Sequence, residues 1–427
     1  MDMIVLVIVL ALILLSVPIG FALFLATVVC FLIFTDLSLI MLGQAMFLKL
    51  DKFSLMSIMF FILAGTLMAR GAMARKIVDF ANAIVGHYKA GMPISGVLSC
   101  ALFGAVSGSA LATLSAIGGL MVPALKKKGM SEDFSVGLLT SSSILGIIIP
   151  PSIPMIIYCL VTDVSVAKLF MAGFLPGFLI FVIFSIYCVV HVMRHHKVSE
   201  SDQTFSATKL WEAGVAGIWA LNMPIIIFGG IFSGIFTATE AAVVAAVYAY
   251  LVEFFIYREL TIKEIARITI NAGVLIASIL IITAGSMVLS DYLTIQLIPN
   301  RITMWITSFV SSPILFIVMV NILLLIAGAF IEVIAAILIL APILFPVAMA
   351  LGVDPIHFGV IMCINLGIGY ITPPVGVNCY LSASLFEMKA TQVFISIVPT
   401  LILLLISLAI LSYFPTISTL LPDLLLK

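Results

Sequence analysis

The chain has 427 residues, of which 64% are hydrophobic and 9% are charged, and its formal net charge is +0. Soluble domains contain about 45 to 50% apolar residues, so the composition excludes an ordinary soluble protein, and the balanced charge excludes a nucleic-acid-binding excess. Several continuous apolar runs approach the roughly 20 residues that a spanning helix needs. The sequence therefore predicts an all-α polytopic membrane protein.

The first predicted elements lie in residues 4–89. Residues 4–34 are too long for one untilted span and contain Pro18 and Gly20, so they form either one kinked helix or a helical pair, and we favour the pair. A linker is expected at 35–53 and a span at 54–68. Residues 73–89 predict an amphipathic arm helix along the membrane interface, because Ile77 and Ile84 recur at helical spacing opposite charged residues.

Next come a glycine-rich apolar segment, residues 93–125, and a span that contains Pro150-Pro151. The segment predicts a re-entrant hairpin with Ser107-Gly108-Ser109 near its tip. The span, residues 134–161, is predicted to be a broken helix because proline removes a backbone donor. After a further span at 169–193, residues 194–210 are the one extended polar linker, expected in the cytoplasm.

The second half repeats this order. A helix pair lies within 211–255, followed by a span at 268–288, an arm segment at 291–308, a hairpin at 313–350, a broken helix at 356–385 and a final span. Five Pro and Gly positions of the first half recur 223 residues later, at Pro346, Gly352, Gly369 and Pro373-Pro374. This constant offset favours a duplication, with repeats at 1–193 and 211–427.

Lys and Arg counts predict how the repeats are oriented. With the linker in the cytoplasm, 14 of the 19 Lys and Arg fall inside, and the five outside are Lys49, Lys52, Lys168, Arg301 and Lys427. The first hairpin then enters from the cytoplasm and the second from the outer side, so we expect two inverted-topology repeats.

Breaks in membrane helices expose backbone groups that ions or substrate can satisfy, and uncharged oxygens suit Na⁺. A first cation site is expected where the hairpin tip faces the first break, and a second at the equivalent place in the second half. The candidate Na⁺ residues are Ser107, Ser109, Ser142, Gly146, Pro150, Gly328, Glu332, Gly369, Thr372, Pro373 and Val375. The candidate substrate residues are Ser109, Ser143, Asn365 and Asn378.

Structural explanations compete with these functional ones. The prolines could merely kink helices, and the small residues could merely let helices approach closely. Glu332 could couple a cation or sense protons, or it could simply cap a helix start. For Glu240, the run Thr237 to Glu240 fits a capping box. The six cysteines have no metal-ligand spacing and are expected to be buried and free.

Four stretches carry a family resemblance: Gly104 to Pro123, Ile147 to Ser152, Gly234 to Ala241 and Gly369 to Asn378. Together they resemble the large membrane subunit of tripartite ATP-independent periplasmic (TRAP) transporters, and the resemblance covers essentially the whole chain. It implies Na⁺-driven uptake of an organic acid into a bacterium through the inner membrane. It also implies an elevator motion, in which the hairpins and broken helices move against a scaffold of helix pairs, joined to it by the arms.

The resemblance further implies two protein partners, a periplasmic substrate-binding protein and a small four-helix membrane subunit. Because no such extension precedes residue 4, the small subunit is expected on a separate chain. Family substrates include C4-dicarboxylates and sialic acids, with a slight preference here for sialic acid. The runner-up function is a binding-protein-independent Na⁺/carboxylate symporter of the same hairpin-containing class. Apart from Na⁺ we expect no cofactor, and the absence of a catalytic constellation or P-loop argues against an enzyme or a primary pump.

Overall fold

The structure, a computed structural model, describes residues 4–15, 17–35, 38–195 and 205–426. The described residues contain α-helices and two π-helical turns, and no strand. Among them, eight helices are long and apolar enough to cross a membrane, or nine with the bent pair α21–α22. The prediction of an all-α polytopic membrane protein is confirmed. Residues 196–204 of the expected linker lie outside the described part.

The first half, up to the linker, contains the following helices. They are α1 (Ile4–Leu14), α2 (Ile19–Phe34), α3 (Leu39–Leu50), α4 (Phe53–Arg70), α5 (Met73–Val85), α6 (Gly91–Ser107), α7 (Ala110–Thr113), the π-helical turn η1 (Leu114–Gly118), α8 (Gly119–Lys127), α9 (Glu132–Ser142), α10 (Leu145–Ile148), α11 (Ile153–Thr162) and α12 (Val166–His195).

The second half follows the linker. Its helices are α13 (Ala207–Phe232), α14 (Ala238–Leu251), the π-helical turn η2 (Val252–Tyr257), α15 (Ile262–Ile295), α16 (Ile298–Thr307), α17 (Pro313–Phe330), α18 (Val333–Ala350), α19 (Pro355–Gly369), α20 (Val377–Leu385), α21 (Ala390–Ser396), α22 (Val398–Tyr413) and α23 (Thr416–Leu425).

Three regions differ from the expectations drawn from the sequence. Residues 4–34 form two helices that pack against each other, the favoured alternative. The linker expected at 35–53 is wrong, because α3 occupies most of it and begins where the Ser38 hydroxyl accepts from Ile40 N. The arm helix ends at Val85 rather than Lys89, and the first residues of the expected second arm segment continue α15 to Ile295.

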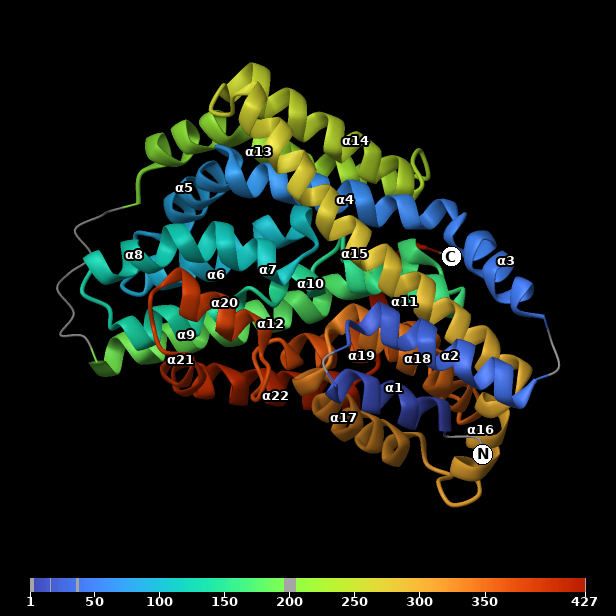
Figure 1. Ribbon diagram of the computed structural model, residues 1–427. Coiled ribbons are helices and arrows are strands. Elements are labelled where there is room, and N and C mark those ends of the chain that lie inside the picture. Colours follow the sequence, from blue (N-terminus) through green and yellow to red (C-terminus); the bar gives the residue numbers. More distant parts are fainter. Residues whose placement is uncertain (1–3, 16, 36–37, 196–204, 427) are drawn as a thin grey trace.

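The helices are arranged in layers (Figure 1). α13 and α14 lie along the top of the view, α4 packs against α14, and the long α15 crosses the front of the molecule diagonally and packs against α2 and α4. Beneath them lie the hairpin α6–α8 and the helices α9–α11. Of the later helices, α17 and α22 lie near the bottom of the view, and one large apolar core joins these layers.

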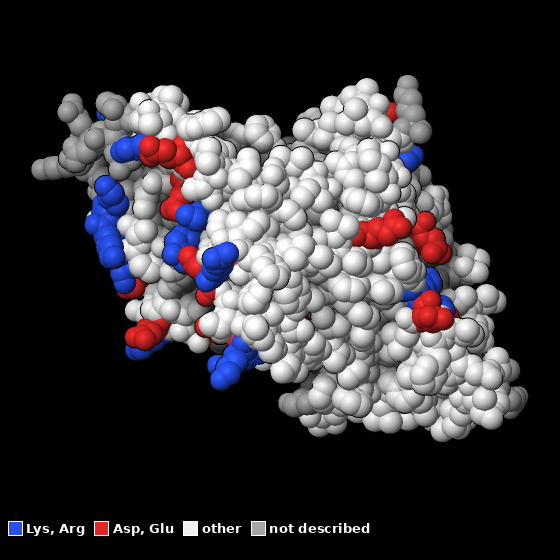
Figure 2. Space-filling view, turned by 90° about the horizontal axis from the view of Figure 1, so that it is seen from above, with Lys and Arg blue, Asp and Glu red and all other residues white. Residues whose placement is uncertain are grey.

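The charged side chains lie toward two ends of the molecule (Figure 2). On the face shown, most Lys and Arg gather at one end, a smaller group that is mostly acidic lies toward the other, and the band between them carries neither. Such a band is what a helical bundle presents to the hydrocarbon of a bilayer.

Candidate functional site

The tip of the first hairpin rests on the first Pro-Pro break. α6 ends at Ser107, Gly108 adopts a left-handed conformation with φ +60°, and Ser109 caps α7 by accepting from Ala112 N at 3.4 Å. Ile153 N, just beyond the break, donates to Gly108 O at 3.3 Å. Glycine is needed here both for its positive φ and because a Cβ would lie 2.7 Å from Pro151 O.

Small residues bring the two backbones of this first unit together. A Cβ on Gly104 of α6 would lie 2.6 Å from the Cα of Gly146 in α10, and a Cβ on Gly146 would lie 2.8 Å from Ser109 O. Ser107 Oγ lies 3.1 Å from Thr113 Oγ1, across the hairpin. The structure thus places Ser107, Ser109 and Gly146 around one junction, beside the break at Pro150.

The second hairpin makes an equivalent junction. A Cβ on Gly369 of α19 would lie 2.5 Å from the carbonyl carbon of Gly328 in α17. Val375 N, in the second break, donates to Ala329 O at 3.2 Å. Both Pro-Pro bonds are cis, and α19 and α20 are separated by residues 370–376. Thr372 lies in this break, where its hydroxyl donates to Ile368 O at 2.8 Å.

The second tip carries a carboxylate where the first tip carries hydroxyls. Glu332 Oε2 accepts from Ile334 N at 2.9 Å and from Ala335 N at 3.2 Å, so it caps α18. Its Oε1 accepts from the Tyr370 hydroxyl at 2.7 Å. Tyr370 is the first residue after α19, so this bond joins the tip to the break. Tyr370 was not predicted as a partner of Glu332, although it lies within the motif that pointed to this break.

The two halves meet at buried polar side chains. Asn378 Nδ2, at the start of α20, donates to Ser143 Oγ at 2.8 Å, and Thr140 Oγ1 lies 2.6 Å from Ser382 Oγ. Ser141 Oγ lies 2.7 Å from Thr400 Oγ1. We call these six residues and Ser142 the central polar cluster; all seven are at most 1% exposed.

Two oxygens of the central polar cluster have no hydrogen-bond partner, Ser142 Oγ and Asn378 Oδ1. A buried polar atom without a partner is costly, and such atoms are rare. Ser142 is the last residue of α9, one short helix before the first break, and Asn378 lies in the first turn of α20, after the second break. An uncharged oxygen fits a cation such as Na⁺, so these two oxygens of the broken helices suit the ion that the sequence suggested. Ser382 and Thr400 were missed, because nothing in their local sequence marks them.

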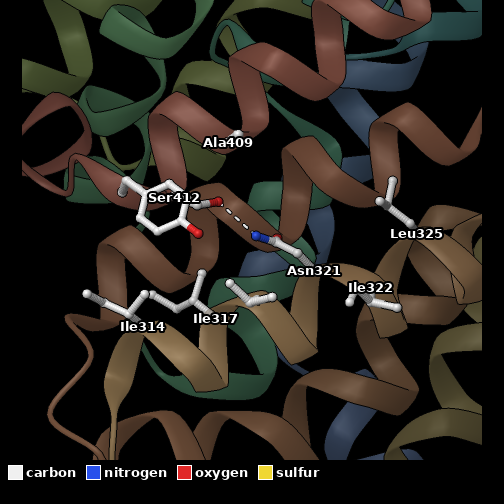
Figure 3. A pocket seen from close by; sticks show the side chains of 9 residues that line it. Ile314, Ile317, Asn321, Ile322, Leu325, Ala409 and Ser412 are labelled. Atoms are coloured by element: carbon white, nitrogen blue, oxygen red, sulfur yellow. Dashed lines mark hydrogen bonds between the residues drawn. The ribbon is translucent and has the colours of Figure 1, made fainter.

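Asn365 does not join this cluster. Its Nδ2 donates to the Oδ1 of Asn321 at 2.8 Å and to Asn321 O at 3.1 Å, within the α17–α19 contact. Asn321 Nδ2 in turn donates to Ser412 Oγ at 2.8 Å, as the dashed line in Figure 3 shows. These two side chains lie at a pocket of about 160 Å³ that is otherwise mainly apolar. These hydrogen bonds pack α19 against α17, and Asn365 Oδ1, like Asn378 Oδ1, is buried without a hydrogen-bond partner. The assignment of Asn365 to substrate therefore stays a prediction.

Comparison with known proteins identifies the family. The model of the tripartite ATP-independent periplasmic transporter DctM component matches residues 6–417. The C4-dicarboxylate TRAP transporter large permease protein DctM of Pseudomonas aeruginosa is 39% identical over 392 residues, which cover 92% of this chain and 91% of that protein.

Two longer relatives match the same region. The isethionate TRAP transporter permease protein DctMQ of Oleidesulfovibrio alaskensis is 34% identical, and the match covers 94% of this chain and 63% of that protein. The sialic acid TRAP transporter permease protein SiaT of Haemophilus influenzae is 34% identical, with 96% of this chain and 66% of that protein covered.

A solved structure shares the fold. The YdaH transporter of Alcanivorax borkumensis superposes with a TM-score of 0.58 and 13% identity, covering 92% of this chain and 96% of that one. The family match spans nearly the whole sequence and agrees with an all-helical chain that crosses the membrane many times. The chain is therefore a multi-pass protein of the bacterial inner membrane, a transporter permease rather than an enzyme, and it belongs to the DctM family of TRAP transporter large subunits.

Proposed function

We propose that this permease imports an organic acid together with Na⁺, receives it from a periplasmic binding protein, and moves it by an elevator motion. The observation that carries the proposal is that two hairpin tips rest on two helix breaks, and that the broken helices of both halves meet at the Ser143–Asn378 hydrogen bond. Interrupted helices at the interface of two repeats are where secondary transporters hold substrate and coupling ions.

The first cation site is proposed at the first junction, with Ser107, Ser109, Ser142, Gly146 and Pro150 as its residues. The unpartnered Ser142 Oγ supports it, as does the backbone of Ser109 lying against Gly146. The second site is proposed at the second junction, from Gly328, Glu332, Gly369, Thr372, Pro373 and Val375. Glu332 would supply its one negative charge, and Tyr370 and two backbone amides hold that carboxylate in place.

The substrate is proposed to bind beside the central polar cluster, where Ser143, Asn378 and Ser109 offer hydrogen-bonding groups. The first turn of α20 lies there, and the positive end of a helix favours an anion. The names of the relatives cover C4-dicarboxylate, sialic acid and isethionate. The C4-dicarboxylate permease is 39% identical to this chain and the sialic acid permease 34% identical, so we propose a small carboxylate as the first substrate to test and sialic acid as the second.

The motion is proposed to carry the two hairpins and the broken helices past the layer of α4, α13, α14, α15 and α2. In this arrangement the two halves are inverted, with the Lys126-Lys127-Lys128 loop in the cytoplasm and Lys168 outside. The division of charge between the two ends in Figure 2 supports this orientation, because cytoplasmic loops are rich in Lys and Arg. Cysteines introduced at Lys127 and Lys168 should react with an impermeant reagent from opposite sides.

Two partners are proposed. TRAP transporters work with a periplasmic binding protein and a small membrane subunit, and the relative DctMQ extends well beyond the region that matches this chain. We propose that a small four-helix subunit on a separate chain packs against this one. Long exposed apolar side chains on α13 and α14, among them Trp211, Trp219 and Ile225, leave surface for it or for lipid.

The test is uptake in liposomes that contain the large and small subunits, with an inward Na⁺ gradient, a labelled carboxylate and its binding protein. We expect uptake that needs all of these components. Equal uptake without Na⁺ would contradict the proposed coupling of transport to Na⁺. Equal uptake without the binding protein would favour the alternative function, a binding-protein-independent symporter. A matched assay with sialic acid decides between the two substrate classes.

A further inference from the structure

The corner between α4 and α5 is closed by a side chain from a distant part of the chain. α4 ends at Arg70 and α5 begins at Met73, so the backbone turns within Gly71 and Ala72. The first amides of a helix have no acceptor inside it. Glu253 supplies two acceptors: Ala72 N donates to its Oε2 and Met73 N to its Oε1, each at 2.9 Å.

Glu253 is a carboxylate in a setting built to hold it. Its side chain is 0% exposed, and it belongs to the π-helical turn η2 at the end of α14. A buried carboxylate is costly unless it is hydrogen-bonded, and the positive start of a helix stabilises it. A Cβ on Gly71 would collide with the Glu253 carboxyl group, so glycine leaves the space that this contact needs. π-helical turns are frequent at functional sites.

The helix held in this way connects two parts of the molecule. α5 packs against α13 on the scaffold side and against α6 and η1 of the first hairpin. Glu253 therefore ties the start of α5 to α14, which itself packs against α4 and α13. A second, exposed contact, Arg75 to Glu259 at 2.7 Å, lies close by, but exposed ion pairs contribute little.

The corresponding corner of the second half is closed in another way. Between α15 and α16, Gln296 N donates to Tyr292 O and Leu297 N to Thr294 O, both at 3.0 Å, and Leu297 adopts φ +54°. These bonds are local to the chain. The Gln296 side chain also donates to Phe34 O at 3.2 Å. The first corner is thus held by a buried carboxylate 180 residues away, whereas the second is held by local backbone bonds and one neutral amide side chain.

We propose that Glu253 is a positioning residue that holds the start of the arm helix α5 against the scaffold, and that the rate of transport depends on its two hydrogen bonds to Ala72 and Met73. The inference rests on the proposed elevator function. The hydrogen bonds of Glu253 go to the arm backbone and to none of the proposed cation or substrate residues. Weakening these two hydrogen bonds should therefore slow the movement of the first hairpin while leaving the binding of Na⁺ and substrate intact.

The first experiment measures uptake by the complete complex in liposomes at varied Na⁺ and substrate concentrations. For Glu253→Gln, which loses the charge on two hydrogen bonds, we expect a maximal rate about tenfold lower, with half-saturating concentrations changed less than about twofold. The matched control is Glu264→Gln, since Glu264 caps α15 through an exposed local box with Thr261. It should retain the parental rate.

Gly71→Ala tests the same contact with the charge kept. Its Cβ should displace the carboxyl group and slow transport to a similar degree, and the double variant Gly71→Ala/Glu253→Gln should be no slower than either single variant. Parental rates in both single variants would overturn the proposal. So would an equal loss in Glu264→Gln, or a change in half-saturation as large as the change in rate.

A second measurement is independent of transport. Spin labels on Asp79→Cys of α5 and Glu212→Cys of α13, both exposed positions, report the distance between arm and scaffold, and the six native cysteines are buried. We expect a broader distance distribution in Glu253→Gln than in Glu264→Gln, and equal distributions would refute the claim that Glu253 holds α5 in position. If the parental complex shows no Na⁺-dependent uptake, the proposed function fails, but the spin-label distances still decide the role of Glu253.

Discussion

The two hairpin junctions share a backbone arrangement and differ in chemistry. In each, two glycines bring a hairpin helix against a broken helix, and an amide just after the Pro-Pro pair donates to a carbonyl at the tip, Ile153 to Gly108 and Val375 to Ala329. The first tip ends in a serine cap, whereas the second ends in Glu332 bonded to Tyr370. The close backbone contact is therefore the common requirement, and the charge distinguishes the second junction.

The largest effect is expected from filling the glycine contacts. Gly369→Ala places a Cβ 2.5 Å from backbone, and Gly104→Ala places one 2.6 Å from backbone, so neither clash can be relieved by moving a side chain. Overpacking of this kind costs about 1–3 kcal/mol or more. Thermal unfolding of the purified protein in detergent should show both variants destabilised, together with loss of uptake.

Gly273→Ala is the control, because a Cβ there meets nothing within 4 Å in α15 and alanine favours a helix. It should be neutral or slightly stabilising. If Gly104→Ala and Gly369→Ala unfold at the same temperature as this control, the shared contact is not what holds the junctions together.

The next effect concerns the charge that separates the junctions. Glu332→Gln weakens three hydrogen bonds to a carboxylate and should destabilise the protein by about 2 kcal/mol, whereas Tyr370→Phe removes one of them and should cost about 1 kcal/mol. Half-saturating Na⁺ should rise for Glu332→Gln far more than for Tyr370→Phe. Identical Na⁺ curves for Glu332→Gln and the parent would make Glu332 a helix cap alone.

The parts of these junctions that could be predicted are those fixed by backbone chemistry. Proline lacks an amide proton, and the helices are interrupted at both Pro-Pro pairs, Pro150-Pro151 and Pro373-Pro374, whereas single prolines such as Pro176 lie inside continuous helices. Glycine marks close approach, as at Gly146 and Gly369. The capping box between Thr237 and Glu240 could also be predicted, because the two residues lie within one helical turn, and the structure contains it.

Contacts between distant side chains could not be predicted. Asn365 and Asn378 have the same chemistry and similar surroundings in sequence, yet one bonds to Asn321 and the other to Ser143. Glu253 gave no signal at all, since its partners are the backbone amides of Ala72 and Met73. Which way a side chain points depends on the packing of whole helices, and a single sequence does not contain that information. The helix α3 was missed because its apolar run is short and interrupted by Gly43 and Gln44.

The contrast between the two asparagines gives a smaller, sharper test. Asn378→Ala removes a hydrogen bond across the two halves beside an unpartnered acceptor, so we expect half-saturating substrate to rise about tenfold. Asn365→Ala should destabilise the protein by about 1 kcal/mol through its lost bonds to Asn321, with half-saturating substrate unchanged. Uptake at varied substrate concentration separates the two, and an equal rise in half-saturating substrate for Asn365→Ala would support the predicted assignment of Asn365 to substrate.

The smallest effects are expected from single hydroxyls at the two breaks. Ser109→Ala removes the cap of α7 and costs about 1 kcal/mol, and Thr372→Ala removes a hydroxyl that bonds to Ile368 O. Each is proposed as a residue of one cation site, so each variant should need a few times more Na⁺ for half-maximal uptake while its expression survives. Because the sites lie in different halves, the double variant should lose Na⁺ activation by the product of the two factors. If the Na⁺ activation curves of both single variants overlay the parental curve, Ser109 and Thr372 are not residues of the cation sites. The hypothesis that each break binds its own ion would then be wrong.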